Sequence, residues 1–225
     1  MIKLQNVSKS YFLGDTEVKA VVDVTLEIKA KEYVSILGTS GSGKSTLMYL
    51  IGLLEHPTSG KILLEGKDVS KFTDDEFSKI RNRHVGFVFQ SFNLINKFTV
   101  LENVLLPTRY IKEKIDFDPL KRADELLKKF GIHDRRDFFP NKISGGQQQR
   151  VAMVRALMMK PKIILADEPT GNLDTKTGDE ILDLMEGLNK EFGVTVILVT
   201  HELGVAKRTK RQIYIKDGML VDKYL

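Results

Sequence analysis

The amino-acid sequence predicts an α/β fold, in which a parallel-sheet core carries an N-terminal antiparallel β subdomain and an inserted helical subdomain. Three observations predict it: short runs of almost only apolar residues, an N-terminal region that alternates between apolar and polar residues, and a helical interval in the middle of the chain. The chain has 225 residues, which is long enough for one such domain with a full hydrophobic core.

The apolar runs are the candidate strands of the parallel sheet. Strands of a parallel sheet are covered on both faces by helices, so they show continuous apolar residues instead of a period of two. Four such runs are present, at Tyr33–Leu37, Val85–Phe89, Ile163–Asp167 and residues 194–200. The sequence therefore predicts a parallel sheet built from these four segments.

Other segments favour antiparallel strands. Residues 2–35, approximately, and residues 60–65 alternate more, which suits a sheet with one face toward water. Within residues 212–225, Asp217 and Gly218 separate two strand-like runs, and Asp-Gly is a strong hairpin signal. We expect an antiparallel β subdomain near the N-terminus and a hairpin at the other end.

The interval between residues 99 and 160 has a helical pattern. Asp118 followed by Pro119 is a typical cap and first-turn pair, and the next apolar residues fall on one helical face: Leu120, Ala123, Leu127 and Phe130. We therefore expect a single domain over residues 1–225. Residues 1–98 and 161–225 would form the core with the β subdomain, and residues 99–160 the helical subdomain.

Composition narrows the possible partners. The 35 Lys and Arg residues exceed the 30 Asp and Glu residues only slightly and are spread along the chain, whereas nucleic-acid binding favours a concentrated basic stripe. There is no cysteine, which excludes disulfides and thiolate chemistry. No signal peptide and no apolar stretch of about 20 residues is visible. We expect no nucleic-acid partner, and a protein that is cytosolic or reaches a membrane only through a partner.

Residues 38–45, GTSGSGKS, form a complete phosphate-binding loop between a predicted strand and a predicted helix. Glycines in such a loop permit unusual backbone angles and leave room for phosphate oxygens; here they are Gly38, Gly41 and Gly43. Lys44 is expected to reach the β- and γ-phosphates, and the Ser45 hydroxyl to bind Mg²⁺. Phosphate contacts are also expected at Thr39, Ser40, Ser42 and Thr46, since the loop amides and the helix N-terminus point at the anion.

Hydrolysis needs a carboxylate near the metal and a group that activates water. Asp167 and Glu168 end the buried run that begins at Ile163, and ligand sites of parallel sheets lie at the carboxyl ends of strands. Asp167 is expected beside Mg²⁺ and Glu168 beside the attacking water as the general base. Taken alone, a strand that ends in a polar turn is also a common structural feature.

Two further polar residues follow predicted core strands. His201 follows residues 194–200 and would emerge near the γ-phosphate, where it could bind a phosphate oxygen or hold the water and Glu168 in place. Gln90 follows Val85–Phe89, and its amide oxygen could bind Mg²⁺ or the attacking water. For each residue taken singly, a purely structural role remains an alternative.

A second helix start with anion-binding character lies at residues 143–147, ISGGQ. Ser144 and Gln147 have the spacing of a capping box, and Gly145 and Gly146 leave the first-turn amides accessible at the positive end of the helix dipole. The chain thus has one phosphate loop but two anion-binding helix starts. A plain helix cap with flexible glycines is the alternative reading.

The set of motifs, in this order, resembles the ATP-binding subunit of ABC transporters over essentially the whole chain. It comprises GTSGSGKS, Gln90 after FVF, ISGGQ, ILADEP at 164–169, GNLD at 171–174, and His201. The resemblance implies a RecA-like P-loop NTPase core with ATP and Mg²⁺ as cofactors. Ile143 stands where the family commonly has Leu, which is a conservative departure.

The resemblance also implies a dimer in which each subunit caps the ATP of the other. Ser144, Gly145, Gly146 and Gln147 would then act on the partner's nucleotide, and Asp174 would lie at the dimer interface. Tyr11 would stack on adenine, with packing on the sheet as the structural alternative. The chain contains one nucleotide-binding unit, so we expect it to pair with a second ATPase subunit, most simply another copy.

Three longer segments are similar to the lipoprotein-releasing and macrolide-export branch: FVFQSFNLINKFTVLENVLLP, SGGQQQRVAMVRAL and ADEPTGNLD. This similarity implies a peripheral ATPase at the cytoplasmic face of the inner membrane that drives transmembrane permease subunits. The neighbouring cell-division type, which regulates wall remodelling without transport, is the alternative. A soluble ABC protein acting on DNA or ribosomes fits less well, because such proteins usually carry two ATPase units or a long coiled-coil insertion.

Overall fold

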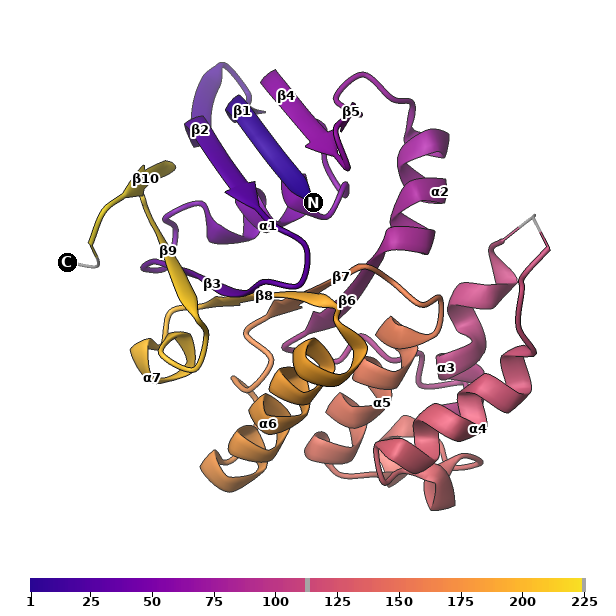
Figure 1. Ribbon diagram of the computed structural model, residues 1–225. Helices are drawn as coiled ribbons and strands as arrows, with labels where there is room; N and C mark the ends of the chain where they lie inside the picture. Colours follow the sequence, from indigo (N-terminus) through magenta and orange to yellow (C-terminus); the bar gives the residue numbers. More distant parts are fainter. Residues whose placement is uncertain (112–113, 224–225) are drawn as a thin grey trace.

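The computed structural model of the chain describes residues 1–111 and 114–223. Its core is a six-stranded sheet in the order β10-β9-β3-β8-β7-β6 (Figure 1). All neighbours in it run parallel except β10 and β9, the first pair in this order. The strands are β3 (Tyr33–Leu37), β6 (Val85–Phe89), β7 (Ile163–Asp167), β8 (Thr195–Thr200), β9 (Arg211–Lys216) and β10 (Met219–Val221).

The predicted parallel sheet is therefore confirmed, with β8 beginning one residue later than expected. The hairpin predicted at Asp217 and Gly218 is also confirmed, since both residues lie between β9 and β10 and have left-handed φ angles of 49° and 78°. Residues 224 and 225, which the prediction included, lie outside the described part of the chain.

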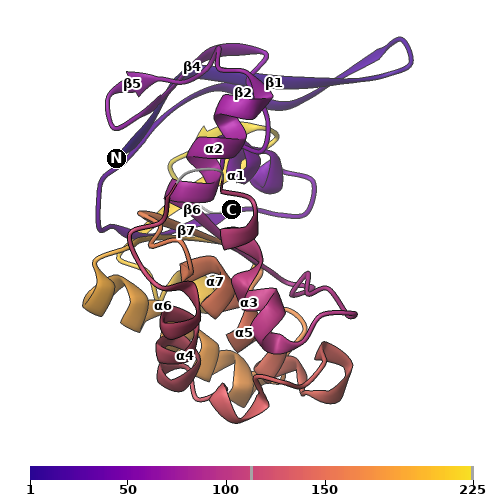
Figure 2. The same cartoon turned by 90° about the vertical axis from the view of Figure 1, so that its right-hand side faces the viewer.

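A second, antiparallel sheet has the order β2-β1-β4-β5 and confirms the predicted β subdomain. Its two long strands form a ribbon that extends beyond the rest of the sheet (Figure 2). The predicted antiparallel region was nevertheless too long, because residues 33–35 belong to the parallel strand β3. The strands are β1 (Ile2–Leu13), β2 (Thr16–Ile28), β4 (Ser59–Leu64) and β5 (Lys67–Asp68).

Helices cover both faces of the core sheet (Figure 1). On one side α1 (Lys44–Ile51) packs between the two sheets, and α2 (Asp74–His84) leads into β6. On the other side lie α3 (Val100–Arg109), α4 (Pro119–Lys129), α5 (Gly145–Leu157) and α6 (Thr175–Phe192). Short helical turns complete the fold: residues His133–Arg135, Pro140–Lys142 and α7 (Leu203–Ala206).

The two helical layers explain why the core strands lack polar alternation. In β7, Ile163 and Leu165 belong to the hydrophobic core around α1 and the antiparallel sheet. Ile164 and Ala166 point the other way, into the core formed with α3 to α6. Since successive side chains of a strand face opposite sides, both sets must be apolar when both faces are covered.

The predicted helix after Asp118 is α4. Asp118 caps it by accepting hydrogen bonds from the amides of Leu120 and Lys121, at 2.9 and 3.2 Å. Of the four apolar residues predicted to share one helical face, Ala123, Leu127 and Phe130 are buried, whereas Leu120 is 55% exposed. Leu126 is buried instead, because the face of α4 that contacts the core is centred away from Leu120. Helical periodicity finds such a face only to within a residue or two.

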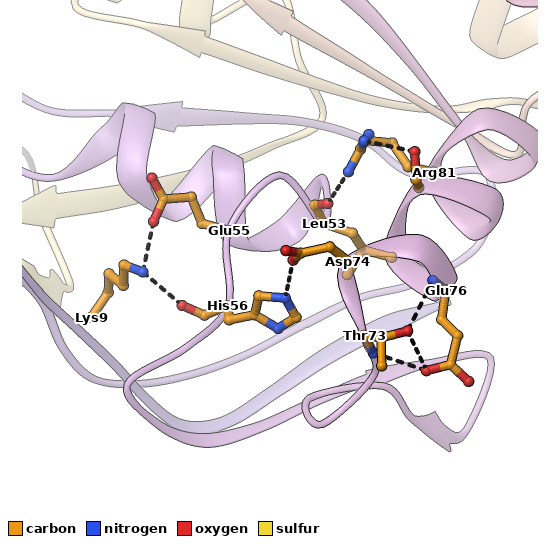
Figure 3. A network of polar contacts seen from close by, with 9 residues as sticks. Lys9, Leu53, Glu55, His56, Thr73, Asp74, Glu76 and Arg81 are labelled. Atoms are coloured by element: carbon orange, nitrogen blue, oxygen red, sulfur yellow. Dashed lines mark hydrogen bonds and ion pairs between the residues drawn. The ribbon is translucent and has the colours of Figure 1, made fainter. Parts of the chain in front are cut away.

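A polar network ties the end of α1 to both β1 and α2 (Figure 3). Lys9 of β1 donates to the carbonyl of His56 at 2.9 Å and pairs with Glu55 at 2.7 Å. On the other side, the His56 ring lies 2.9 Å from an Asp74 oxygen, and Arg81 donates to the carbonyl of Leu53 at 2.7 Å. The segment that follows α1 is thus held from two directions.

Candidate active site

A cavity of about 670 Å³ lies beside the phosphate loop, at the carboxyl ends of β7 and β8. This volume is within the usual range for sites that hold a small molecule or cofactor. Its walls are the phosphate loop with the start of α1, three residues of β2, and the residues that follow β7 and β8. The lining residues are Val18, Lys19, Ala20, Thr39, Ser40, Gly41, Gly43, Lys44, Ser45, Thr46, Glu168 and His201.

The phosphate-loop glycines serve two different needs. Gly41 and Gly43 have left-handed φ angles of 77° and 99°, which side chains resist. Gly38 does not adopt such an angle, so the expectation of an unusual backbone conformation was wrong there. A Cβ atom on Gly38 would instead lie 2.3 Å from the carbonyl oxygen of Ile215 in β9. Gly38 is therefore required by close packing against the neighbouring strand.

Lys44 is buried near the carboxylates of Asp167 and Glu168. Its ammonium group donates to the carbonyl of Thr39 at 2.7 Å. Burial lowers the pKa of Lys44, and the nearby carboxylates of Glu168 and Asp167 oppose that shift. Burial raises the pKa of Asp167 and so does the Glu168 carboxylate, while Lys44 lowers it. The charges of Lys44, Asp167 and Glu168 therefore influence one another beside the phosphate loop.

Glu168 and His201 are in direct contact. The Nδ1 atom of His201 lies 2.7 Å from Oε1 of Glu168. Glu168 has a left-handed φ of 43°, and its backbone N–H donates to the carbonyl of Val199 in β8 at 2.8 Å. A non-glycine residue in this conformation is uncommon and is typical of functional positions. The fold therefore directs Glu168 toward His201 and the cavity.

Tyr11 borders the site without lining the cavity. Burial raises the pKa of Tyr11, the nearby Thr46 side chain lowers it, and the charge of Glu55 raises it further. Lys9, which pairs with Glu55, lies 5.1 Å from the centre of the Tyr11 ring. Tyr11 thus lies close to Lys9 and to Thr46 at the start of α1.

Gln90 does not line the cavity either. Its side-chain amide donates to Oδ1 of Asn172 at 3.3 Å, and Nδ2 of Asn172 donates to the carbonyl of Gln90 at 3.0 Å. This role of Asn172 and the place of the β2 residues in the cavity wall were not predicted from the sequence. No local sequence signal identifies them, because both contacts join segments that are far apart in the chain.

The second helix start has the predicted cap. The Ser144 hydroxyl accepts from the amide of Gln147 at 3.3 Å, and the Gln147 side chain accepts from the amide of Ser144 at 3.0 Å. Gly146 packs so tightly that a Cβ atom there would lie 2.4 Å from Cγ2 of Thr177. Residues 144–147 do not contribute to the phosphate-loop cavity of their own chain.

Asp174 caps α6. Its carboxylate accepts from the Thr177 amide at 3.0 Å and from the Thr177 hydroxyl at 2.6 Å. The bond from the hydroxyl, followed by that from the amide, holds the pKa of Asp174 below its usual value. The same Thr177 packs against Gly146, so the segments around Asp174 and the start of α5 are in contact.

A family model described as ABC transporter matches residues 21–171, which include the phosphate loop, ISGGQ and the Asp167–Glu168 pair. The chain belongs to the ABC transporter family. As a member of this family it is an ATP-binding, ATP-hydrolysing cassette with a mixed α/β fold.

Individual ABC relatives cover the chain almost completely. An uncharacterized ABC transporter ATP-binding protein of Methanocaldococcus jannaschii is 50% identical over 97% of this chain and 94% of its own length. The macrolide export ATP-binding/permease protein MacB of Rhodopirellula baltica is 47% identical over 99% of this chain. The chain spans only 33% of the length of that longer protein.

Solved ABC structures agree with the fold. The dimeric structure of the Methanocaldococcus jannaschii cassette in a post-hydrolysis state, bound to ADP and Pi, has a TM-score of 0.88. It is 47% identical and covers 98% of this chain and 96% of its own. In the part of this chain that the structure describes, no helix is long and apolar enough to cross a membrane.

Proposed function

We propose that two copies of this cassette close head to tail around two ATP molecules and power a membrane permease. One observation carries the proposal: the capped helix start at Ser144–Gln147 stands apart from the phosphate-loop cavity of its own chain. Its first-turn amides are suited to bind an anion, and a second copy supplies one. The dimeric, ADP-bound and Pi-bound structure of a relative supports this arrangement.

Mg²⁺ fits the charges around Asp167. Two carboxylates share one ammonium group, and burial with the Glu168 charge raises the pKa of Asp167, so a divalent cation would relieve an unfavourable arrangement. The residues that would hold it are Ser45 through its hydroxyl, Asp167 through its carboxylate and Gln90 through its amide oxygen. Bound Mg²⁺ would neutralise charge on the β- and γ-phosphate oxygens.

The residues around the γ-phosphate have separate proposed roles. Glu168 accepts a proton from the attacking water as general base. His201, at 2.7 Å from Glu168, holds that carboxylate in position. Lys44 binds the β- and γ-phosphates in place of its present partner, the Thr39 carbonyl, and supplies positive charge where negative charge develops. Tyr11 would offer an aromatic face to the adenine base.

The permease is proposed to dock in a groove beside Gln90. This groove has a volume of about 440 Å³ and lies where α2 and β6 meet α3 and α5; its lining includes Arg81, Phe89, Pro107, Tyr110 and Arg155. Residues 99–160 would form the helical subdomain on one side, and residues 1–98 and 161–225 the core with the β subdomain.

The cassette would thus be a peripheral subunit at the cytoplasmic face of the inner membrane. The similarity to macrolide export proteins supports an exporter or a lipoprotein- or peptide-extruding system. A neighbouring gene for a permease with a large extracytoplasmic domain would support export, whereas one for a small four-span partner would contradict it in favour of wall regulation.

Glu168→Gln tests the dimer. The variant should bind ATP, fail to hydrolyse it and accumulate as a dimer, which light scattering would detect. Lys44→Ala in the same background is the matched control, since it should lose ATP and remain monomeric. A Glu168→Gln protein that stays monomeric at saturating ATP would contradict head-to-tail closure of the isolated cassette.

A further inference from the structure

The contact between Gln90 and Asn172 joins the ends of two neighbouring strands. Gln90 directly follows β6 and Asn172 lies shortly after β7, and these strands pair in parallel from Val85–Ile163 to Phe89–Asp167. The two amides are reciprocal partners: Asn172 accepts from the Gln90 side chain at 3.3 Å and donates to the Gln90 backbone at 3.0 Å. Asn172 therefore holds both the side chain and the main chain of Gln90.

Gly171 makes room for this pair. A Cβ atom on Gly171 would lie 2.6 Å from Nε2 and 3.0 Å from Cδ of Gln90. The φ angle of Gly171 is not in the left-handed region, so its backbone conformation alone does not require glycine. The absence of a side chain at Gly171 is what lets the Gln90 amide lie along this segment and reach Asn172.

The segment that holds Gln90 also contacts the second helix start. A Cβ atom on Gly145 would lie 3.3 Å from Cδ2 of Leu173 and 3.6 Å from the ring of Phe92. Leu173 directly follows Asn172, and Phe92 lies two residues after Gln90. The same short segment therefore meets the loop after β6 and the first turn of α5.

We infer that Asn172 is a positioning residue for Gln90. It restricts the directions that the Gln90 amide can take and fastens this amide to the segment that carries Asp174. Leu173, the next residue in this segment, lies against Gly145 in the first turn of α5. This inference rests on the proposed role of Gln90 at the metal or the attacking water, and it names the residue that sets the direction of that side chain.

A double-mutant cycle tests the inference. Asn172→Ala removes both hydrogen bonds, and Gly171→Ala displaces the Gln90 amide by steric contact, so the two variants disturb the same side chain in different ways. Each should lower kcat about tenfold, the effect of roughly one hydrogen bond, and change the KM for ATP less than twofold. In a Gln90→Ala background, neither change should have a further effect on kcat.

A second measurement does not depend on turnover. Mn²⁺ would be titrated into the Glu168→Gln protein saturated with ATP, with electron paramagnetic resonance as the readout of free Mn²⁺. Asn172→Ala should weaken Mn²⁺ binding several-fold, while affinity for metal-free ATP stays unchanged. Asn96→Ala, which removes an exposed amide in the stretch after β6, is the matched control and should behave as the parent protein.

The outcomes separate the inference from the proposed function. If Asn172→Ala lowers kcat equally with and without the Gln90 side chain, Asn172 has only a structural role and the inference is overturned. If Gln90→Ala itself has the parent kcat and Mn²⁺ affinity, the proposed role of Gln90 is wrong, and the inference fails with it. If Asn172→Ala does not fold, Gly171→Ala completes the cycle alone.

Discussion

Gly146 and Thr177 are packed so closely that a Cβ atom on the glycine would lie 2.4 Å from Cγ2 of the threonine. In the sequence, Gly146 is accounted for by the approach of an anion to the first turn of α5. The contact provides a second reason, internal to one chain: the start of α5 packs directly against the first turn of α6. Gly146 is thus required by the fold as well as being a candidate for nucleotide binding.

This contact predicts different effects for the two adjacent glycines. Gly146→Ala should destabilise the isolated chain by about 1–3 kcal/mol through overpacking. The new methyl group of Gly145→Ala would lie 3.3 Å from Leu173, 3.6 Å from Phe92 and 3.9 Å from the Asn172 carbonyl, so this variant should change stability by less than about 0.5 kcal/mol. Denaturant unfolding would measure both values.

Thr177→Ser provides the control for the packing effect. It removes the Cγ2 methyl group but keeps the hydroxyl that donates to Asp174 at 2.6 Å. In this background, Gly146→Ala should regain most of its lost stability. If Gly146→Ala were as stable as the parent protein, the contact with Thr177 would not be the reason that glycine is required at this position.

The contact between His201 and Glu168 predicts a selective loss of turnover. His201→Ala should reduce kcat about 100-fold, a typical contribution of a group that supports a general base, because Glu168 loses its partner at 2.7 Å. ATP affinity, measured by equilibrium binding without turnover, should change little. A matching loss of ATP affinity would instead indicate that His201 mainly binds the phosphate.

We expect the ring of Tyr11 to contribute more to ATP binding than its hydroxyl does. Tyr11→Ala should weaken ATP binding about 10-fold or more, since base–aromatic stacking contributes about 1–3 kcal/mol. Tyr11→Phe should bind ATP nearly as well as the parent. Lys9→Met removes the ammonium group 5.1 Å from the ring centre and should have an intermediate effect. Equal affinities for the Ala and Phe variants would exclude stacking.

Removal of the Tyr33 hydroxyl is expected to increase the free energy of unfolding. This buried hydroxyl has no hydrogen-bond partner among the residues that the structure describes, and burial raises the pKa of Tyr33 to about 12. Because an unsatisfied buried polar group is unfavourable, Tyr33→Phe should stabilise the protein by about 1 kcal/mol near pH 7. Urea unfolding would measure this difference.

The Tyr33 hydroxyl also determines the direction in which stability changes at high pH. The folded state disfavours the tyrosinate, so the parent protein should lose stability as pH rises from about 10 toward 12. Tyr33→Phe should lack this part of the loss. Tyr110→Phe is the control, because Tyr110 is 74% exposed. Parallel pH profiles of the parent and Tyr33→Phe would contradict the assignment.

Local patterns in the sequence were sufficient for much of the fold. The continuous apolar character of segments such as Ile163–Asp167 predicted the parallel strands, because it reflects burial on both faces. The caps at Asp118 and Ser144 were predicted equally well, since each depends on residues within one turn of helix. Leu120 shows the limit: it shares a helical face with Ala123, yet it is 55% exposed, and the sequence pattern alone did not show this difference.

The sequence by itself determined the family, the phosphate loop and the polar residues at the ends of the core strands, such as Gln90 and His201. These features depend on residues that are adjacent in the chain. Only the tertiary structure decided that Gly38 packs against Ile215, that Gly146 packs against Thr177, and that Asn172 holds Gln90. These contacts join segments that are brought together by the order of strands in the sheet. Their close distances are a consequence of packing, which no local sequence pattern encodes.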